Sequence, residues 1–503
     1  MITLSGPALA SLDPSSDLYQ RLLTLHPRLA RKDFTLWGAD AEEEAKVRLN
    51  WVDLPYTSNN LIPELAKVRE DFAGRERIIL CGMGGSSLGP EVIAASYQRD
   101  IFICDSTDPH YLAHCLEGRL EDLVIVVGSK SGSTIETSSQ RAFFEKYLAD
   151  HGLQPQRHMV IVTDPESPLD VQARSAGFTV INADPHVGGR FSVLSAFGLV
   201  PAALMGIDVD HLLRQAQGAH DQILTSHLAV DVAYLLATQT NQYCGFTDAG
   251  SQLPGLSDWI EQLIAESTGK DGRGRLPVVT EDVTSAQSVG FGISFASGAD
   301  LNVEGDLASH FIFWEWVTAL LGAALEIDPF NQPNVTEAKE QTSKLLHEWD
   351  GLPPILAPER SNGALDFFGP SFSDFLREIP ADGYLAIMAY LDRRDERELE
   401  KLRALLSEKT GRPVTFGWGP RFLHSTGQFH KAGQPNGAFL QISGECTIDF
   451  AIPGQNYSFA TLLAAQCQGD GRALAARKYP AMRIHLRNRQ TGLSQLLSEA
   501  HAL

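Results

Sequence analysis

Residues 79–90 have the sequence ILCGMGGSSLGP, in which an apolar run leads through a glycine-rich turn into a segment suited to a helix. Such a turn presents backbone N–H groups at the start of a helix, where the helix dipole favours an anion. Tight packing of a strand against a helix requires the same glycines, so this stretch alone does not decide the function. It does indicate an α/β unit, with a phosphate or a sugar oxygen as the candidate ligand.

Apolar runs separated by helix-length segments continue along the chain. The first set lies at residues 78–81, 101–104, 123–127, 159–162 and 179–181, and the second at 277–279, 384–390, 414–416, 438–442 and 482–485. Continuous apolar runs are typical of parallel strands that are covered on both faces. The predicted fold class is therefore α/β, with two doubly wound parallel-sheet domains that carry helices on both faces.

The predicted domain boundaries follow from these two sets of runs. Residues 1–45 are expected to form a helical leader, residues 46–205 a first domain that binds phosphate, and residues 206–503 a second domain. Helices are expected at residues 195–205, 221–239, 308–325, 335–349 and 396–409, from the helical spacing of their apolar residues. No internal repeat of fixed period is apparent.

Composition and charge exclude several classes of function. The 503 residues carry a formal net charge of −21, which disfavours nucleic acid and anionic membrane surfaces as partners. The six cysteines are spread along the chain without metal-ligand spacing, so we expect reduced thiols and no metal site. No apolar stretch is long enough to span a bilayer without charges, and the N-terminus lacks the pattern of a signal peptide. We therefore expect a cytoplasmic protein.

A second glycine-containing turn is rich in hydroxyl groups. Residues 126–137 have the sequence VVGSKSGSTIET, which places five serine and threonine side chains within nine residues after an apolar run. One hydroxyl would be enough to cap the helix that follows. Five hydroxyls beside unpaired backbone N–H groups favour a site for a phosphate dianion. The expected partner is therefore a small phosphorylated molecule.

A nucleotide-dependent dehydrogenase is an alternative at this point of the argument. A dinucleotide-binding fold carries an acidic residue about 20 residues beyond its glycine-rich turn, and Asp105 roughly meets this requirement. Quenching of nicotinamide fluorescence on binding would identify such an enzyme.

Three further stretches narrow the choice. The two turns resemble those of the sugar isomerase (SIS) fold, and GGRFSVLS at residues 188–195 resembles the phosphoglucose isomerase family. AESTGK at residues 265–270 and DPFNQPNVTEAK at residues 328–339 are similar to two more motifs of that family. The resemblance extends over the chain from about Asp33 onward.

This resemblance implies a role for individual residues. The implied phosphate ligands are Ser86, Ser129, Ser131 and Thr134, with the backbone of Gly85 and Lys130 nearby, and Gln332 is an implied contact to the sugar. Among the implied catalytic residues, Glu266 is the proton-transferring base, Arg190 stabilises the enediolate, and Lys339 contacts the sugar.

The histidine that opens the sugar ring stands in an unusual place. Most members of the family that the chain resembles carry it between the glutamate and lysine motifs, where this chain has only His310, which we interpret as a core or interface histidine. Residues 422–433, FLHSTGQFHKAG, resemble the family's histidine-bearing segment, so we assign ring opening to His424, with His430 as an alternative. This order of motifs is similar to that in the isomerase half of bifunctional transaldolase/phosphoglucose isomerases, although we recognise no transaldolase half.

The activity implied by the resemblance is the reversible isomerisation of glucose 6-phosphate and fructose 6-phosphate through a cis-enediol(ate), in glycolysis and gluconeogenesis. It requires no metal and no cofactor, and it implies a homodimer. Two alternatives remain: a non-catalytic sugar-phosphate sensor with the same fold, and a bifunctional phosphoglucose/phosphomannose isomerase. A sensor would not need to retain Glu266, Arg190, Lys339 and His424 together, so their joint presence favours an enzyme.

Overall fold

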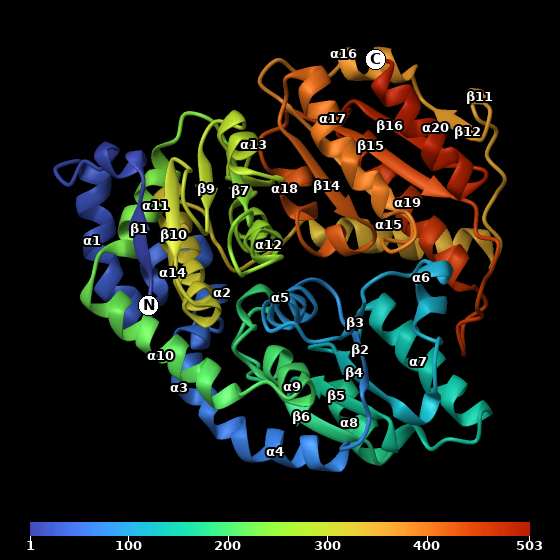
Figure 1. Cartoon of the computed structure of the whole chain (residues 1–503), viewed down its shortest axis with the longest axis horizontal. Helices are drawn as coiled ribbons and strands as arrows, with labels where there is room; N and C mark the ends of the chain where they lie inside the picture. Colours follow the sequence, from blue (N-terminus) through green and yellow to red (C-terminus); the bar gives the residue numbers. More distant parts are fainter. The chain divides into compact units, whose positions relative to one another are not determined.

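The chain forms two compact units in a computed structural model, which describes all residues apart from the side chains of Val335, Thr336 and Ala338. Unit 1 comprises Met1–Asp105 and Gly118–Asn331, and unit 2 comprises Ser106–Glu117 and Gln332–Leu503. Figure 1 shows their elements coloured along the sequence. Within the described part of the chain, two sheets belong to unit 1 and a third belongs to unit 2.

The first sheet of unit 1 is entirely parallel and has the strand order β3-β2-β4-β5-β6. Its strands are β2 (Arg77–Cys81), β3 (Phe102–Cys104), β4 (Leu123–Gly128), β5 (Met159–Thr163) and β6 (Thr179–Asn182). The central strand β4 is buried along its whole length because helices cover the sheet: α9 (Ala196–Leu204) packs against four of the strands, and α7 (Ile135–Asp150) packs against β2 and β4. The predicted strands and the α/β fold class are confirmed.

The second sheet of unit 1 has the strand order β1-β10-β9-β7-β8. Its strands are β1 (Thr3–Ser5), β7 (Tyr243–Thr247), β8 (Leu276–Val279), β9 (Gly292–Ser294) and β10 (Leu301–Glu304). Strand β1 runs antiparallel to β10, and the other neighbours are parallel. The Met1 ammonium lies 2.9 Å from the Asp306 carboxylate. The predicted helical leader thus also supplies a strand to this sheet.

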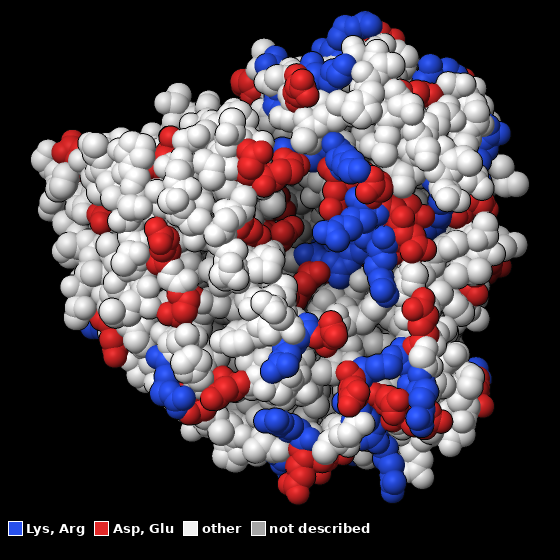
Figure 2. Space-filling view, viewed as in Figure 1, with Lys and Arg blue, Asp and Glu red and all other residues white. Residues whose placement is uncertain are grey.

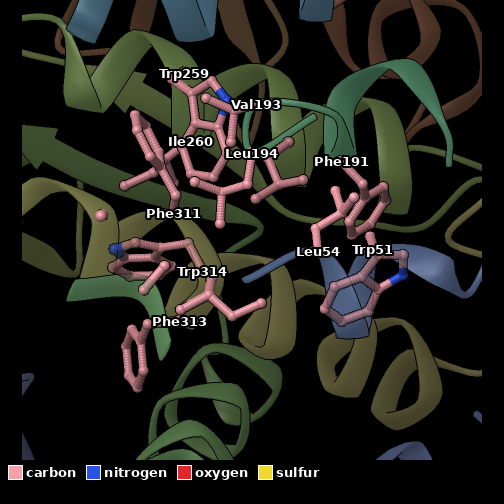
Figure 3. Packing of buried hydrophobic residues seen from close by; sticks show 14 of the residues in the cluster. Trp51, Leu54, Phe191, Val193, Leu194, Trp259, Ile260, Phe311, Phe313 and Trp314 are labelled. Atoms are coloured by element: carbon pink, nitrogen blue, oxygen red, sulfur yellow. The ribbon is translucent and has the colours of Figure 1, made fainter. Parts of the chain in front are cut away.

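Helix α14 (Leu307–Leu325) is the core helix of unit 1. By length and composition alone it could cross a membrane, but 94% of its apolar window is buried inside the fold. Aromatic side chains pack around it (Figure 3), with the ring centroids of Trp259 and Phe311 5.0 Å apart. The rings of Trp51 and Phe191 stack at 5.1 Å in the same hydrophobic core.

The remaining helices of unit 1 pack around these two sheets. They are α1 (Asp17–Ala30), α2 (Glu42–Ala45), α3 (Leu54–Thr57), α4 (Ile62–Asp71), α5 (Leu88–Ser96), α8 (Pro168–Ser175), α10 (Val209–Thr225), α11 (Leu228–Thr238), α12 (Leu256–Thr268) and α13 (Val283–Ser288). The single helix expected at residues 221–239 is wrong. The chain leaves the helical conformation at Ser226, whose φ of −129° and ψ of 173° are extended, and this break separates α10 from α11.

The sheet of unit 2 has the strand order β11-β12-β16-β15-β13-β14. Its strands are β11 (Arg360–Asn362), β12 (Leu365–Phe368), β13 (Tyr384–Tyr390), β14 (Val414–Trp418), β15 (Gly437–Gly444) and β16 (Ala481–Leu486). Strands β13 to β16 are parallel to one another, whereas β12 runs antiparallel both to β16 and to the edge strand β11. Residues 206–503, expected to form one domain, therefore contribute to two sheets.

Seven helices of unit 2 surround this sheet in the described residues. They are α6 (Pro109–His114), α15 (Val335–Trp349), α16 (Phe372–Arg377), α17 (Lys401–Thr410), α18 (Gly427–Ala432), α19 (Phe459–Ala476) and α20 (Arg489–His501). Helix α15 coincides with the helix expected at residues 335–349. Helix α19 packs along α15 and against β15 and β16.

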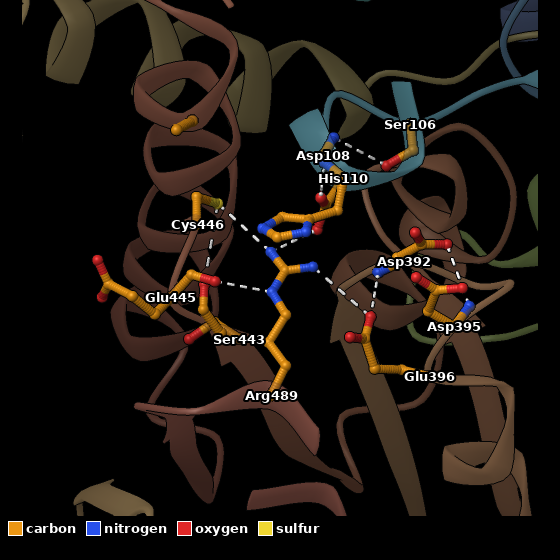
Figure 4. Close-up of polar contacts among 12 residues, drawn as sticks. Ser106, Asp108, His110, Asp392, Asp395, Glu396, Ser443, Glu445, Cys446 and Arg489 are labelled. Carbon is orange, nitrogen blue, oxygen red and sulfur yellow. Dashed lines mark hydrogen bonds and ion pairs between the residues drawn. The ribbon is translucent and has the colours of Figure 1, made fainter. Parts of the chain in front are cut away.

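The segment Ser106–Glu117 reaches loops that follow the parallel strands of unit 2 (Figure 4). The Asp108 carboxylate, fully buried, lies 2.8 Å from Arg489 at the start of α20. Arg489 also donates to the carbonyl of Glu445, which follows β15, and lies 3.5 Å from Glu396. A network of charge-assisted hydrogen bonds therefore holds residues 106–117 against the loops of this sheet. Detachment of the segment would leave the Asp108 carboxylate and the Arg489 guanidinium without each other, which is costly for buried charges.

Gly85 makes the closest approach between the first glycine-rich turn and residues 188–195. A Cβ atom at Gly85 would lie 2.1 Å from the carbonyl oxygen of Gly189, whereas a Cβ atom at Gly189 would meet nothing within 4 Å. We therefore predict that Gly85→Ala lowers the free energy of unfolding by about 1–3 kcal/mol, because backbone must move. Gly189→Ala, the control on the other side of this contact, should change it by less than about 0.5 kcal/mol. Urea unfolding measures both, and equal losses would contradict the packing described.

Candidate active site

Arg190 and Glu266 form a buried ion pair in unit 1. The Arg190 Nη1 atom lies 3.3 Å from Glu266 Oε1, and both side chains are almost completely buried. Arg190 Nε donates to the hydroxyl of Ser267 at 2.8 Å, and Nη2 donates to the carbonyl oxygens of Pro329 at 2.5 Å and Asn331 at 3.1 Å. Burial lowers the pKa of Arg190, while the neighbouring carboxylate favours the charged form. The guanidinium is thus fixed in one orientation by several partners.

Helix α12 places Glu266 in this position. Its first turn is held by the Asp248 carboxylate, which accepts hydrogen bonds from the backbone N–H groups of Gly255 and Ser257. Trp259 on the same helix packs into the hydrophobic core (Figure 3). Glu266 lies in the last turn, where its Oε2 atom accepts a hydrogen bond from Gln262 Nε2 at 3.1 Å. The carboxylate is therefore oriented through both of its oxygens.

The first glycine-rich turn lies against this ion pair. The 3₁₀ turn Gly84–Ser86 contacts both α12 and the 3₁₀ turn Gly189–Phe191 that carries Arg190. The implied ligands Gly85 and Ser86 stand on this turn, with Gly85 buried and Ser86 half-buried. The structure thus brings the first sequence motif together with the two implied catalytic residues of unit 1.

The hydroxyl-rich turn connects β4 to the start of α7. Ser129 is buried and its hydroxyl accepts from the N–H of Gly132, whereas Ser131 is exposed and its hydroxyl lies 2.6 Å from that of Ser133. Thr134 is the N-cap residue of this 16-residue helix, and its side chain makes no capping hydrogen bond among the described residues. Hydroxyls and free N–H groups at the start of a long helix are suited to bind an anion.

The side chain of Lys130 has other partners. Its Nζ atom lies 2.9 Å from the Asp164 carboxylate and donates to the carbonyl oxygen of Val187 at 2.8 Å. Only the Lys130 backbone was expected near a ligand, and its carbonyl accepts hydrogen bonds from Asp164 and Thr163. The Lys130 side chain therefore stabilises the turn between β4 and α7 through its contacts with Asp164 and Val187.

Unit 2 brings together the other two motifs. Gln428, in the segment that follows His424, exchanges two hydrogen bonds of 3.0 Å with Asn334, which lies directly before α15. Gln332 and Lys339 flank Asn334 in the chain, and both are exposed. The histidine-bearing segment and the lysine-bearing helix, 94 residues apart at this contact, are therefore neighbours.

The environments of the three candidate histidines differ. His424 is half-buried at the end of a 3₁₀ turn. His430 is buried, its Nδ1 atom lies 2.8 Å from the hydroxyl of Tyr384, and burial lowers its pKa to about 3. His310 is fully buried against Phe295 in unit 1, without a described hydrogen-bond partner, and burial lowers its pKa to about 3 as well. His310 and His430 are thus neutral core residues at physiological pH.

Positive charge gathers locally in unit 2 although the chain is acidic. On the face shown in Figure 2, basic side chains cluster over the region of α15 and α19, with acidic side chains among them. Arg477, which follows α19, binds Glu337 of α15 through two hydrogen bonds of 3.0 and 2.6 Å. Its Nε atom also donates to the carbonyl of Lys431 in α18. These contacts fix α15, and with it Lys339, to the histidine-bearing segment.

A group of three residues with metal-ligating atoms lies in unit 2 apart from the predicted site residues. His114, Asp392 and Asp395 have ligand atoms within 4.8 Å of one another. The contacts of His114 are ion pairs, to Asp392 at 2.9 Å and to Glu117 at 2.8 Å, and they help to hold the segment Ser106–Glu117 in place. These ion pairs account for the group without a metal ion.

Sequence reasoning missed three side chains around the ion pair of unit 1. Gln262 and Ser267 contact Glu266 and Arg190 directly, and Lys270 is buried beside them. The i,i+4 spacing of Gln262 and Glu266 on one helix face was a usable signal. The position of Lys270 was not, because its side chain meets residues almost 60 positions further along the chain.

Comparisons with known proteins agree with these motifs. The model of the phosphoglucose isomerase family matches residues 71–284, which include both turns, Arg190 and Glu266. A probable glucose-6-phosphate isomerase from Haloarcula marismortui is 32% identical over 265 residues, which are 50% of this chain and 61% of that protein. A glucose-6-phosphate isomerase from Thermus thermophilus is 36% identical over 240 residues, 45% of this chain and 56% of that protein. The part of the chain that carries these motifs is thus similar to the phosphoglucose isomerase family.

The similarity to the family has a defined extent. The chain spans about three fifths of the length of these relatives, and Gln332, Lys339 and His424 lie beyond the range that the family model matches. Among solved structures, a glucose-6-phosphate isomerase from Chlamydia trachomatis has a TM-score of 0.57 at 18% identity, over 70% of this chain and 89% of that one. That likeness shows a shared SIS-type fold.

Proposed function

We propose that this protein is a glucose-6-phosphate isomerase, which interconverts glucose 6-phosphate and fructose 6-phosphate without a metal or cofactor. The observation that carries the proposal is the buried Arg190–Glu266 pair, in which a carboxylate oriented by Gln262 faces a guanidinium with fixed partners. The similarity of residues 71–284 to the phosphoglucose isomerase family supports this proposal. The cytoplasmic location and the homodimer expected from the sequence are part of the same proposal.

In this proposal the phosphate of the substrate binds at the turn between β4 and α7. The hydroxyls of Ser129, Ser131 and Thr134 and the N–H groups at the start of α7 would supply neutral donors. The dipole of a long helix adds a favourable potential for the dianion. Ser86 on the adjacent turn would be a further phosphate ligand, with the backbone of Gly85 nearby.

The proton transfer between carbons 1 and 2 is assigned to Glu266. A carboxylate on one side of a cis-enediol can remove the proton from one carbon and return it to the other. Negative charge then develops on the sugar oxygens, and Arg190 is the cation placed to stabilise it. Because its donors are already held by Ser267, Pro329 and Asn331, little reorganisation is needed during the reaction.

The ring-opening step is assigned to His424 of unit 2, with Lys339 and Gln332 as contacts to the sugar. Histidine is the side chain that commonly donates and recovers a proton in such a step. His424 remains partly exposed, whereas burial keeps His310 and His430 neutral. These environments favour His424 over the other two candidates.

We predict that the purified protein converts fructose 6-phosphate to glucose 6-phosphate in a coupled assay. Free fructose should be a very poor substrate, and inorganic phosphate should inhibit competitively, because the phosphate also contributes to the chemical step. Mannose 6-phosphate in the same assay distinguishes the bifunctional alternative. Binding of fructose 6-phosphate without any turnover would identify a sensor, and nicotinamide fluorescence quenching would identify a dehydrogenase.

Glu266→Gln should lower kcat by about 10²–10⁴-fold, because the amide keeps the volume of the side chain but cannot accept the proton. Binding of fructose 6-phosphate, measured by calorimetry, should be retained. Asp271→Asn is the matched control, since it removes an exposed carboxylate just beyond α12 at a left-handed position that asparagine tolerates. Substantial proton exchange between solvent and carbon 2 in Glu266→Gln would rule out this base.

His424→Ala should slow the turnover of cyclic fructose 6-phosphate by about 10²-fold, while an acyclic substrate analogue still exchanges its carbon-bound proton. His430→Phe and His310→Phe, which keep a ring in the core, should retain activity to the extent that they fold. Equal losses on cyclic and acyclic substrates would assign His424 to another step. A selective loss on cyclic substrate in His310→Phe alone would return the role to the usual family position.

A further inference from the structure

Lys270 is a second buried basic side chain beside Arg190. It follows α12 by two residues, and its side chain is almost completely buried, with 4% of the residue exposed. Its Nζ atom donates to the backbone carbonyl of Asp328. A tight turn fixes its backbone, because the Lys270 N–H donates to the carbonyl of Thr268 and its own carbonyl accepts from Arg273. Both ends of the side chain are therefore anchored.

Asp328 is the first residue of the turn 328–331, whose carbonyl groups bind Arg190. The carboxylate of Asp328 accepts hydrogen bonds from the N–H groups of Phe330 and Asn331, at 2.8 and 3.4 Å, and so closes the turn. The carbonyl oxygens of Pro329 and Asn331 in this turn accept from Arg190 Nη2. Lys270 thus binds the first residue of the turn 328–331, and Arg190 binds the carbonyl groups of its second and fourth residues.

A role in packing alone does not explain a lysine at this position. Burial, and then the proximity of Arg190, lower the pKa of Lys270 to about 7, while Asp328, Glu266 and Asp271 favour its charged form. An apolar side chain of similar length, such as methionine, would fill the same space without the cost of desolvating an ammonium group. The hydrogen bond that this basic group donates to Asp328 therefore points to a role at the ion pair of the site.

We infer that Lys270 is a positioning residue of this site: through its hydrogen bond to Asp328 it holds the turn 328–331, and the carbonyl groups of that turn hold the Arg190 guanidinium against Glu266. The inference rests on the proposed isomerase function for its catalytic consequence. It assigns no contact between Lys270 and substrate. Its structural consequence, the position of Arg190, is independent of any activity.

The test compares two variants of the full-length protein. Lys270→Met removes the charge and the hydrogen bond but keeps the length of the side chain. Arg273→Met is the matched control, because Arg273 belongs to the same turn, is exposed, and donates to a different backbone carbonyl, that of Leu325. We expect Lys270→Met to lower kcat by about 10²-fold, with KM changed by less than about threefold, because a displaced Arg190 affects the transition state more than substrate binding. Arg273→Met should keep both constants.

The pH dependence of stability supplies a readout that packing would not change. Between pH about 7, the folded-state pKa, and 10.5, the unfolded value, the unfolded chain binds a proton at Lys270 that the folded chain has released. The wild-type protein should therefore gain stability relative to Lys270→Met as the pH rises through this window. Urea unfolding of both proteins from pH 6.5 to 10, at steps of about half a unit, measures the difference.

A crystal structure of Lys270→Met separates this inference from the proposed function. Displacement of the turn 328–331 and of the Arg190 guanidinium is expected even if the wild-type protein proves to have no isomerase activity. An unmoved Arg190 would overturn the inference. In an active wild-type enzyme, unchanged kcat in Lys270→Met would overturn it too, whereas failure of the wild-type assay alone would count only against the proposed function.

Discussion

The buried guanidinium of Arg190 connects three parts of unit 1 that are far apart in the sequence. It meets Glu266 and Ser267 at the end of α12 and the carbonyl groups of the turn that follows α14. A buried cation that loses a partner is strongly destabilising, so these elements must be placed together. The neighbouring Phe191 packs on Trp51 in the hydrophobic core, which ties the charge to the apolar interior. Apolar packing of Phe191 and the ion pair of Arg190 therefore fix the position of the same short turn.

Much of the fold followed from local patterns in the sequence. The continuous apolar runs predicted the parallel strands β2 to β6, β8 and β13 to β16, because such strands are buried on both faces. Strands β1, β7, β9, β10, β11 and β12 were missed, because they are short or interrupted by glycine or polar residues. The pairing of β1 with β10 is in addition a long-range contact. The break at Ser226 and the division of residues 206–503 between two sheets were missed for a related reason. Helical spacing continues through both helices, and apolar runs do not reveal which strands pair.

Only those residues of the candidate site that stand in recognisable sequence motifs could be assigned a role from the sequence. The resemblance named Arg190 and Glu266, and the structure places them in contact. It did not name Gln262 or Lys270, whose importance comes from tertiary contacts. The part assigned to His424 remains a prediction. Its motif nevertheless lies beside the lysine-bearing helix, through the reciprocal hydrogen bonds of Gln428 and Asn334. Catalytic groups depend on geometry, so a change in motif order along the chain need not alter the chemistry.

The insertion of residues 106–117 into unit 2 affects the order in which the protein can be completed during synthesis. These twelve residues leave the ribosome between β3 and β4, whereas Arg489, the partner of Asp108, lies in the last helix of the chain. Until α19 and α20 emerge, Thr107 lacks its hydrogen-bond partner Gln466 and Asp108 lacks its ion-pair partner Arg489. The connection between β3 and β4 can therefore reach its final structure only after α20 has been synthesised. A change that removes Arg489 from α20 would thus alter the structure of residues 106–117.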